Sequence, residues 1–263
     1  MPYYFWAIAF IIIPLLLVLY YGLTSEAGTI SLENVFAIAR PAHAKALFLS
    51  VLLSVGCTVV CLLLAYPLCL IMVNRQKAQN SFLLFMLIIP MWMNFMLRTY
   101  AWQSLLEKHG VLNTFLNTIG LPSLHLINTP GAIIFGMVYD FLPFMILPIY
   151  NALQKIDPNL IHAAHDLGAG FWQTLWKVIL PLSMPGIISG ITMVFVPGLT
   201  TFVISALLGG GKVLLIGNVI EQEFTQAYDW HLGSGLSLVL LLFIVINMIL
   251  SSVFDREGNG GLL

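Results

Sequence analysis

Charged residues are scarce in this chain. They make up 8% of its 263 residues, whereas 60% of the residues are hydrophobic. A soluble globular domain carries roughly 25% charged residues, so this composition indicates a protein whose surface faces lipid. The net charge of -1 also argues against a nucleic-acid partner, which would require a basic stripe on the surface.

Cysteine is also rare, and its placement excludes two common uses. Cys57, Cys61 and Cys69 all fall within one apolar stretch. No disulfide framework or zinc site can be derived from that spacing. We therefore expect the three thiols to act as small hydrophobic side chains in a packed helix.

Motifs for catalysis and nucleotide binding are missing. The sequence contains no G-x-x-x-x-G-K-[ST], H-E-x-x-H or G-x-S-x-G pattern. These patterns would indicate, in that order, a phosphate-binding loop, a zinc-dependent hydrolase and a nucleophilic serine. His162 and His165 are three residues apart, but no third metal ligand accompanies them at a suitable spacing. We expect no enzymatic activity, metal or cofactor in this chain. If the chain moves a solute against its concentration gradient, the energy would then come from another polypeptide or from an ion gradient.

Long apolar stretches dominate what remains. A membrane-spanning helix needs about 20 mostly apolar residues, and backbone polar groups in lipid must be satisfied within the structure. We predict an all-α polytopic membrane protein with six transmembrane helices in a single domain. The first is expected to be a retained helix and not a cleaved signal, since no basic segment precedes it. The predicted spans are residues 4–23, 45–73, 82–106, 130–153, 184–208 and 232–254.

Loop charges predict the orientation of these spans. Basic residues favour the cytoplasmic side, and the short turn 74–77 carries two of them. We predict that both the N- and the C-terminus are cytoplasmic. The inner side then receives Arg75, Lys77, Lys155, Lys177 and Arg256, and the outer side Arg40, Lys45, Lys108 and Lys212. The acidic residues gather on the outer side: Glu26, Glu33, Glu107, Glu221, Glu223 and Asp229.

The loop at residues 154–183 is long and patterned, and it falls on the cytoplasmic side. Asp157 can cap a helix whose first residue is Pro158, and Gly168 and Gly170 are typical of the end of that helix. A second, amphipathic helix is predicted to follow and to end at Leu180-Pro181, before the fifth span. The apolar faces of these two helices would be formed by Leu160, Ala164 and Leu167, and by Phe171, Trp172, Leu175, Trp176 and Ile179. Such a pair is either a structural connector or a docking element.

The same loop carries a family resemblance. His162-Ala163-Ala164, then Gly168, and finally Val178-x-Leu180-Pro181 resemble the EAA loop of ABC-importer permeases. His162 stands where that pattern has Glu, so one carboxylate that would face the ATPase is absent. The resemblance implies a type I ABC-importer permease fold. It also implies a set of ATPase-coupling residues: Asp157, Pro158, His162, Ala163, Ala164, Asp166, Leu167, Gly168, Leu180 and Pro181.

Further segments extend this resemblance over residues 4–254. They are similar to spermidine/putrescine permeases, and parts are shared with opine and ferric-iron systems. The segments are Ile89-Pro90-x-Trp92-x-Asn94, Leu142-Pro143-Phe144-Met145, Leu214 to Ile220, and Asp229-Trp230. The resemblance implies a bacterial cytoplasmic (inner) membrane location. It also implies a second permease, two copies of an ATP-binding subunit that holds ATP and Mg, and an extracytoplasmic polyamine-binding protein.

Two charges fall inside or near the ends of predicted spans. Arg98 and Asp140 are costly in lipid, so such residues usually pair or line a watery path. We predict a similar depth for both. Asp140 is then either a structural clamp or a ligand for an ammonium group. Polyamines also favour aromatic faces, which gives a candidate substrate pathway of Trp92, Asn94, Arg98, Tyr100, Tyr139, Asp140, Glu221, Glu223, Asp229 and Trp230.

The favoured hypothesis is ATP-driven polyamine import by alternating access, in which the helix at 157–168 transmits movement to the spans. ABC permeases for opines or ferric iron are the alternatives within that class. A secondary transporter is the rival from another class. It would need ionisable residues clustered near the membrane midplane, and only Arg98 and Asp140 approach that arrangement.

Overall fold

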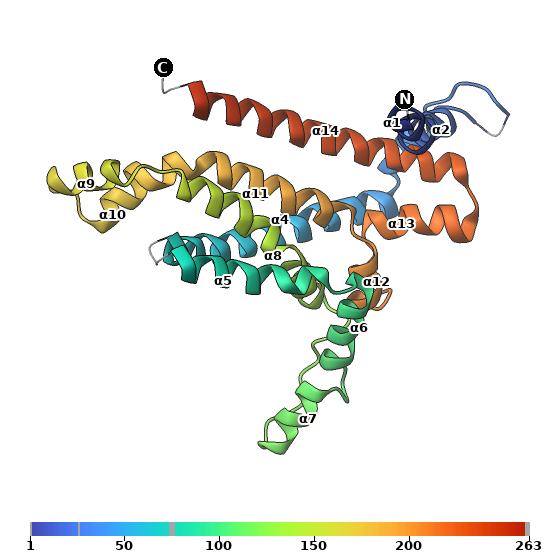
Figure 1. Ribbon diagram of the computed structural model, residues 1–263. Helices are drawn as coiled ribbons and strands as arrows, with labels where there is room; N and C mark the ends of the chain where they lie inside the picture. Colours follow the sequence, from blue (N-terminus) through green and yellow to red (C-terminus); the bar gives the residue numbers. More distant parts are fainter. Residues whose placement is uncertain (1, 26, 74–76, 261–263) are drawn as a thin grey trace.

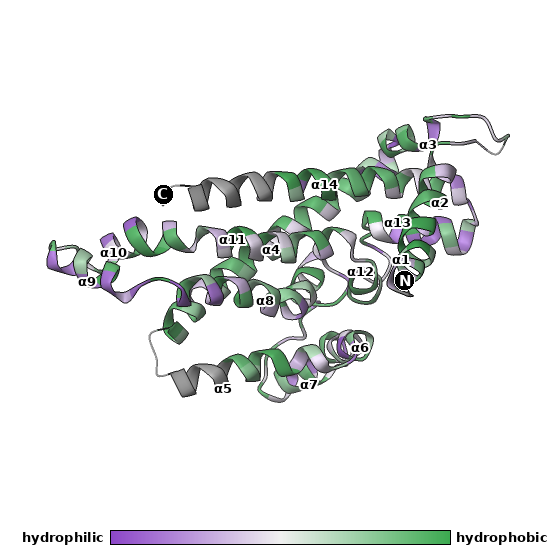
Figure 2. Ribbon diagram, turned by 45° about the horizontal axis from the view of Figure 1, so that its top comes forward, coloured by the Kyte–Doolittle hydropathy of each residue, from purple (hydrophilic) through white to green (hydrophobic). Residues whose placement is uncertain are grey.

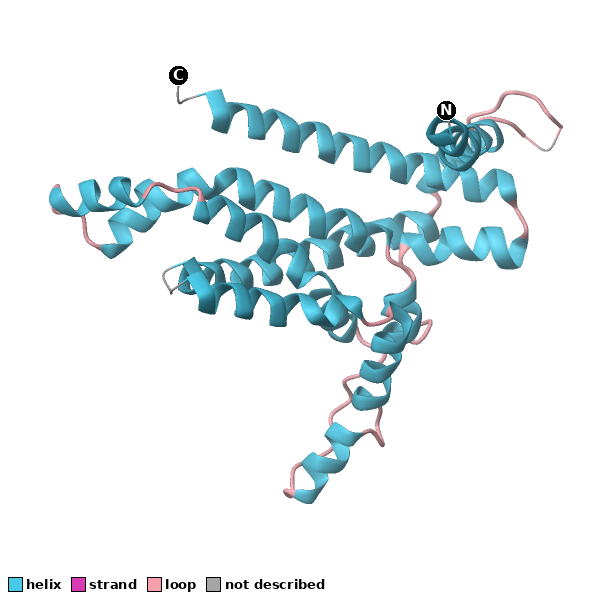
Figure 3. Cartoon of the chain, in the orientation of Figure 1, coloured by secondary structure: helices cyan, strands magenta, loops and turns pink. Residues whose placement is uncertain are grey.

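The computed structural model describes residues 2–25, 27–73 and 77–260, and it is helical almost throughout (Figures 1 and 3). Among the described residues, five helices are long and apolar enough to cross a membrane, and a bent pair of helices forms a sixth candidate. The all-α prediction is thus confirmed. Glu26 and residues 74–76, which entered the charge argument, lie outside the described residues.

The long helices are α4 (Pro41–Val73), α8 (Pro130–Gln154), α11 (Leu180–Thr200) and α14 (Trp230–Gly260). They run side by side along one direction (Figure 1), and their described residues are predominantly hydrophobic (Figure 2). The shorter α-helices are α1 (Pro2–Ala7), α2 (Ile13–Gly22), α3 (Glu33–Phe36), α5 (Lys77–Ile88), α6 (Phe95–Leu106), α7 (Val111–Thr118), α9 (Pro158–Asp166), α10 (Phe171–Thr174), α12 (Val203–Gly209) and α13 (Ile216–Gln222). Short π or 3-10 turns are η1 (Ile8–Ile12), η2 (Ala37–Ala39), η3 (Ile89–Trp92), η4 (Leu175–Ile179) and η5 (Glu223–Ala227).

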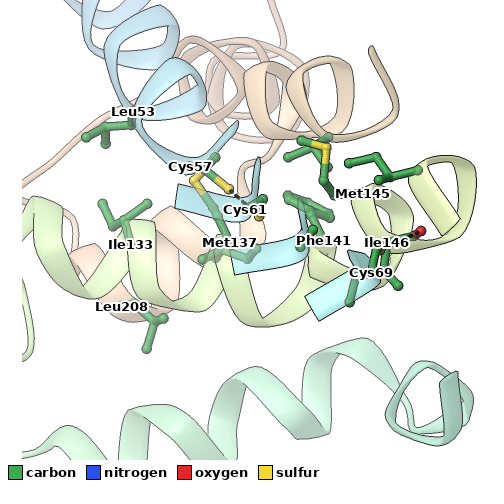
Figure 4. Packing of buried hydrophobic residues seen from close by; sticks show 14 of the residues in the cluster. Leu53, Cys57, Cys61, Cys69, Ile133, Met137, Phe141, Met145, Ile146 and Leu208 are labelled. Atoms are coloured by element: carbon green, nitrogen blue, oxygen red, sulfur yellow. Dashed lines mark hydrogen bonds between the residues drawn. The ribbon is translucent and has the colours of Figure 1, made fainter. Parts of the chain in front are cut away.

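The core lies where α4, α8 and α11 pack together. Cys57, Cys61 and Cys69 are fully buried and free. Their side chains pack against residues of α8, among them Met137 and Ile146 (Figure 4). The Cys69 thiol also lies 3.5 Å from the carbonyl oxygen of Ile146. These small side chains allow α4 to approach α8 closely, which is the packing role expected from the sequence.

Small residues also bring α8 and α11 together. A Cβ atom at Gly186 would lie 2.5 Å from the Cβ of Ala152 and 2.6 Å from the carbonyl oxygen of Pro148. A Cβ at Gly190 would lie 2.7 Å from the Met145 sulfur. Gly186 and Gly190 thus form a small-xxx-small step that lies in an interhelical contact within this chain.

Replacing Gly186 by alanine is expected to destabilise the folded protein by about 1–3 kcal/mol, because the methyl group meets backbone that must move. The midpoint of thermal unfolding in detergent measures the effect. Gly131→Ala is the matched control in α8, since its Cβ would meet nothing closer than Thr129 Oγ1 at 3.7 Å. Equal midpoints for the two variants would contradict the tight packing of α8 on α11.

The predicted third span, residues 82–106, is not one continuous helix. Its two halves meet at an angle of 95°, so α6 and α7 project away from the bundle (Figure 1). Pro90 supplies no backbone donor, and Met93 is extended with ψ 146°. The side chain of Asn94 then caps α6 by accepting hydrogen bonds from the backbone N–H groups of Met96 and Leu97, at 2.9 and 3.2 Å. The sequence prediction treated residues 82–106 as one span because most of them are apolar, and it did not use Asn94 as a helix cap.

The predicted fifth span, residues 184–208, has different boundaries. One continuous helix runs from Phe171 to Thr200, and the backbone then breaks at Thr201 before α12. Leu180-Pro181 does not end the amphipathic helix as predicted. The π-helical turn η4, in which the Leu180 N–H bonds to the Leu175 carbonyl, admits the proline without ending the helix.

The first predicted span forms a helix from Tyr3 to Gly22, but it crosses the bundle. In Figure 1 it is seen nearly end-on, while α14 runs across the view. Its close contact with α14 is at its C-terminal end, where a Cβ on Gly22 would lie 2.6 Å from Leu238 Cδ1. Most of its other side chains are exposed.

Candidate functional site

The short helix α9 projects at one end of the bundle (Figures 1 and 2). Only three residues separate it from α8, which is one of the helices of the core. Asp157 accepts a hydrogen bond from the backbone N–H of Asn159, at 2.9 Å, and Pro158 is the first helical residue. The predicted helix start is confirmed.

The end of α9 is set by Gly168. Its φ is +80°, which L-residues with a side chain rarely adopt. The backbone N–H groups of Gly168 and Ala169 donate to the carbonyls of His165 and Ala164, at 2.9 and 3.0 Å. These bonds satisfy the last carbonyls of the helix and turn the chain toward α10. The predicted stop at Gly168 is confirmed.

The predicted apolar face of α9 is only partly covered by the bundle. Leu167 is 89% exposed and Leu160 is 47% exposed, while Ala164 between them is half-buried. His162, Ala163 and Asp166 are exposed as well, so the EAA-type residues lie on an open surface. Exposed apolar side chains at the tip of a projecting helix are typical of a docking surface.

Two hollows lie at the base of this helix. One, of about 360 Å³, separates α9 from α4 and α10 and is lined by Ile161, His165 and Thr174 among others. The other, of about 630 Å³, is a groove between α8 and α11 that reaches Asp157 and Leu160. Beside the groove, Leu180 is half-buried and Pro181 is exposed. α9 is therefore incompletely packed against the spans on both sides.

A buried ion pair lies at the break in the third span. Arg98 is 8% exposed and Asp140 is 4% exposed, and the Arg98 Nε lies 2.6 Å from Asp140 Oδ1. Arg98 Nη1 also donates to the carbonyl oxygen of Pro90, at 2.7 Å, and the guanidinium lies 5.6 Å from the Tyr139 ring centre. The guanidinium thus joins both sides of the break to α8.

The other predicted pathway residues fall into separate places. Asn94 is used as a helix cap, and Trp92 and Tyr100 are exposed near the break. A second group lies where η5 meets α14. There Asp229 caps α14 by accepting from the backbone N–H of Leu232, at 2.9 Å, and Glu221 Oε1 accepts from the Thr225 hydroxyl. Glu223 is half-buried and Trp230 is 54% exposed in the same turn.

Sequence reasoning missed a buried polar network around Asn218. Its side-chain oxygen accepts from the Ser205 hydroxyl and the Leu215 N–H, and its amide donates to the Phe202 carbonyl. The hydroxyl of Ser50 accepts from the Ile216 N–H at 2.8 Å, which ties α13 to α4. A polar Asn within Leu214 to Ile220 was the available signal, but its partners are distant in sequence.

This architecture defines a class of protein. A polytopic helical bundle with a projecting helix that carries the EAA-type pattern is a transport permease of the ABC-importer type. Residues 48–256 match the family described as the binding-protein-dependent transport system inner membrane component. The chain belongs to this family, whose members are membrane transport components and not enzymes.

Named relatives agree over most of the chain. The spermidine/putrescine transport system permease protein PotB of Haemophilus influenzae is 39% identical, with 96% of this chain and 92% of the relative covered. PotB of Escherichia coli is 36% identical over 90% of this chain and 89% of the relative. A crystal structure of the bacterial alginate ABC transporter matches with a TM-score of 0.81 and 16% identity, covering 97% and 92% of the two chains. At that identity the structural match shows the fold alone.

Proposed function

We propose that this chain is one membrane-spanning subunit of an ATP-driven polyamine importer. The relatives named as spermidine/putrescine permeases support the substrate class. The sequence has no phosphate-binding loop of its own, so ATP and Mg are bound by two copies of a partner subunit. A second permease completes the pore, and an extracytoplasmic binding protein delivers the cargo.

The observation that carries this proposal is the exposed face of α9, connected to α8 by three residues. Closure of the two ATPases would push α9, and α8 and the helix from Phe171 to Thr200 would transmit that movement to the spans. The coupling set named from the sequence supplies the contact surface. Because His162 replaces the usual Glu, this contact relies on the apolar residues Leu160, Ala163 and Leu167 more than on an ion pair.

The proposed orientation places α9 in the cytoplasm. The C-terminal end of α14 lies at the same end of the bundle as α9 (Figure 1), which supports a cytoplasmic C-terminus. Arg75 and Lys77, which lie between the sequences of α4 and α5 or at the start of α5, are assigned to the cytoplasmic side by the positive-inside rule. The proposal also places the N-terminus in the cytoplasm, and only the charges of the loops support that placement.

Reconstitution tests the function. The four-subunit complex in proteoliposomes, supplied with the binding protein, is expected to take up labelled spermidine only with ATP inside, and putrescine should compete. Stronger competition by ferric iron or by an opine would assign another cargo. Uptake by the permease subunits without the ATPases would overturn the mechanism in favour of a secondary transporter.

A further inference from the structure

A small pocket lies at the end of the bundle opposite α9, where α2 crosses the start of α14. Its volume is about 320 Å³, and it is lined by Leu17, Tyr21, Tyr228, Asp229, Trp230 and His231. Three of these residues are aromatic with a phenol or indole ring, one is a carboxylate and one is an imidazole. Among the residues that the structure describes, no lysine or arginine lines the pocket.

The aromatic rings are held in a fixed arrangement by two elements that are distant in sequence. The Tyr21 ring centre lies 6.3 Å from that of Trp230, with the planes tilted by 45°. Phe224 supports the Trp230 ring edge-on at 5.6 Å. Ring faces placed in this way attract a cation and cover the methylene groups attached to it.

The carboxylate is oriented by the helix that it caps. Asp229 Oδ1 accepts from the Leu232 N–H at 2.9 Å, while Oδ2 is engaged by no described residue. The pocket therefore presents a negative charge with one oxygen available.

The imidazole offers a second acceptor. His231 Nδ1 lies 2.7 Å from the Thr24 carbonyl oxygen and 3.0 Å from the Tyr21 carbonyl oxygen. Because both neighbours are acceptors, Nδ1 carries the hydrogen. In the neutral ring Nε2 is then an acceptor with a lone pair, and Nε2 is engaged by no described residue.

We propose that this pocket binds a primary alkylammonium group. Such a group has three N–H donors and a positive charge, which match a carboxylate oxygen, an imidazole nitrogen and the aromatic faces. The choice of this ligand class rests on the proposed function, because each polyamine chain ends in primary ammonium groups. The headgroup of phosphatidylethanolamine carries the same chemistry, so the test separates the two sources.

The test follows Trp230 directly. The assembled transporter is labelled with 5-fluorotryptophan and placed in nanodiscs of phosphatidylcholine and phosphatidylglycerol, without nucleotide or binding protein. The fluorine resonance of Trp230 is assigned by its loss in Trp230→Phe. It is expected to shift when putrescine is added. Asp229→Asn keeps the capping oxygen and removes the charge, so it should require about tenfold more putrescine for half of the shift.

Glu33→Gln is the matched control, because Glu33 is an exposed carboxylate at the start of α3 that does not line the pocket. It should leave the midpoint of the shift unchanged. A Trp230 resonance that does not move at putrescine concentrations that saturate uptake, or equal midpoints for Asp229→Asn and Glu33→Gln, would overturn the ammonium site.

A second set of nanodiscs containing phosphatidylethanolamine identifies the occupant. A resonance already shifted before putrescine is added assigns the pocket to the lipid headgroup, and an unshifted one assigns it to the free amine. Failure of the two proposals is distinguishable. Uptake of spermidine with no effect at Trp230 defeats only the pocket, and a shift at Trp230 in a transporter that imports no polyamine defeats only the proposed cargo.

Discussion

Gly168→Val is expected to reduce ATP-driven transport more than tenfold while the protein still inserts in the membrane. Gly168 has φ +80°, and this left-handed conformation costs an L-residue about 1–2 kcal/mol, with β-branched side chains the least tolerant. The turn would rearrange, and the bonds from Gly168 and Ala169 to the last carbonyls of α9 would be lost. The docking face would then no longer be held in position. Transport-linked ATP hydrolysis in proteoliposomes measures the effect.

Two controls separate backbone conformation from simple bulk. Gly168→Asn should retain most of the coupling, because Asn tolerates the left-handed region. Gly170→Ala should be neutral, since Gly170 has φ -73° and a Cβ there meets nothing within 4 Å. Normal coupling in Gly168→Val would show that the turn at the end of α9 does not transmit the ATPase movement.

Neutralising either member of the Arg98–Asp140 pair is expected to destabilise the folded protein strongly. Removing one partner leaves the other charge buried and unpaired, which costs about 3–5 kcal/mol. Asp140→Leu would also release the guanidinium that holds Pro90 across the break. The double variant Arg98→Met with Asp140→Leu should recover most of the loss, because an apolar pair carries no desolvation penalty. Thermal unfolding in detergent measures all three variants.

Transport by the same variants discriminates between the two roles considered for Asp140. Recovery of both stability and uptake in the double variant supports a structural clamp. Recovery of stability without uptake supports Asp140 as a ligand for the cargo. A double variant whose loss of stability equals the sum of the two single losses would contradict the pairing itself, because the two charges would then act independently.

The helical class and the projecting helix α9 were predictable because their causes are local. A continuous apolar stretch permits little but a helix in lipid, and the cap at Asp157 and the turn at Gly168 each depend on residues within a few positions. The bend at Asn94 and the continuous helix across Pro181 were predicted wrongly. In both cases the outcome depends on which backbone groups find partners, and hydropathy does not report this.

The sequence by itself determined that this protein lies in a lipid bilayer, that it is helical, and where its projecting helix lies along the chain. Each of these follows from composition or from residues that are close together in the sequence. Only the tertiary structure decided that Arg98 meets Asp140, that Asn218 joins α12 to α13, and that α2 brings Tyr21 to Trp230. These contacts join residues from 13 to more than 200 positions apart. Uniformly apolar helices have no strong sequence pattern that selects the facing residue, so small side chains and buried polar partners make that choice in three dimensions.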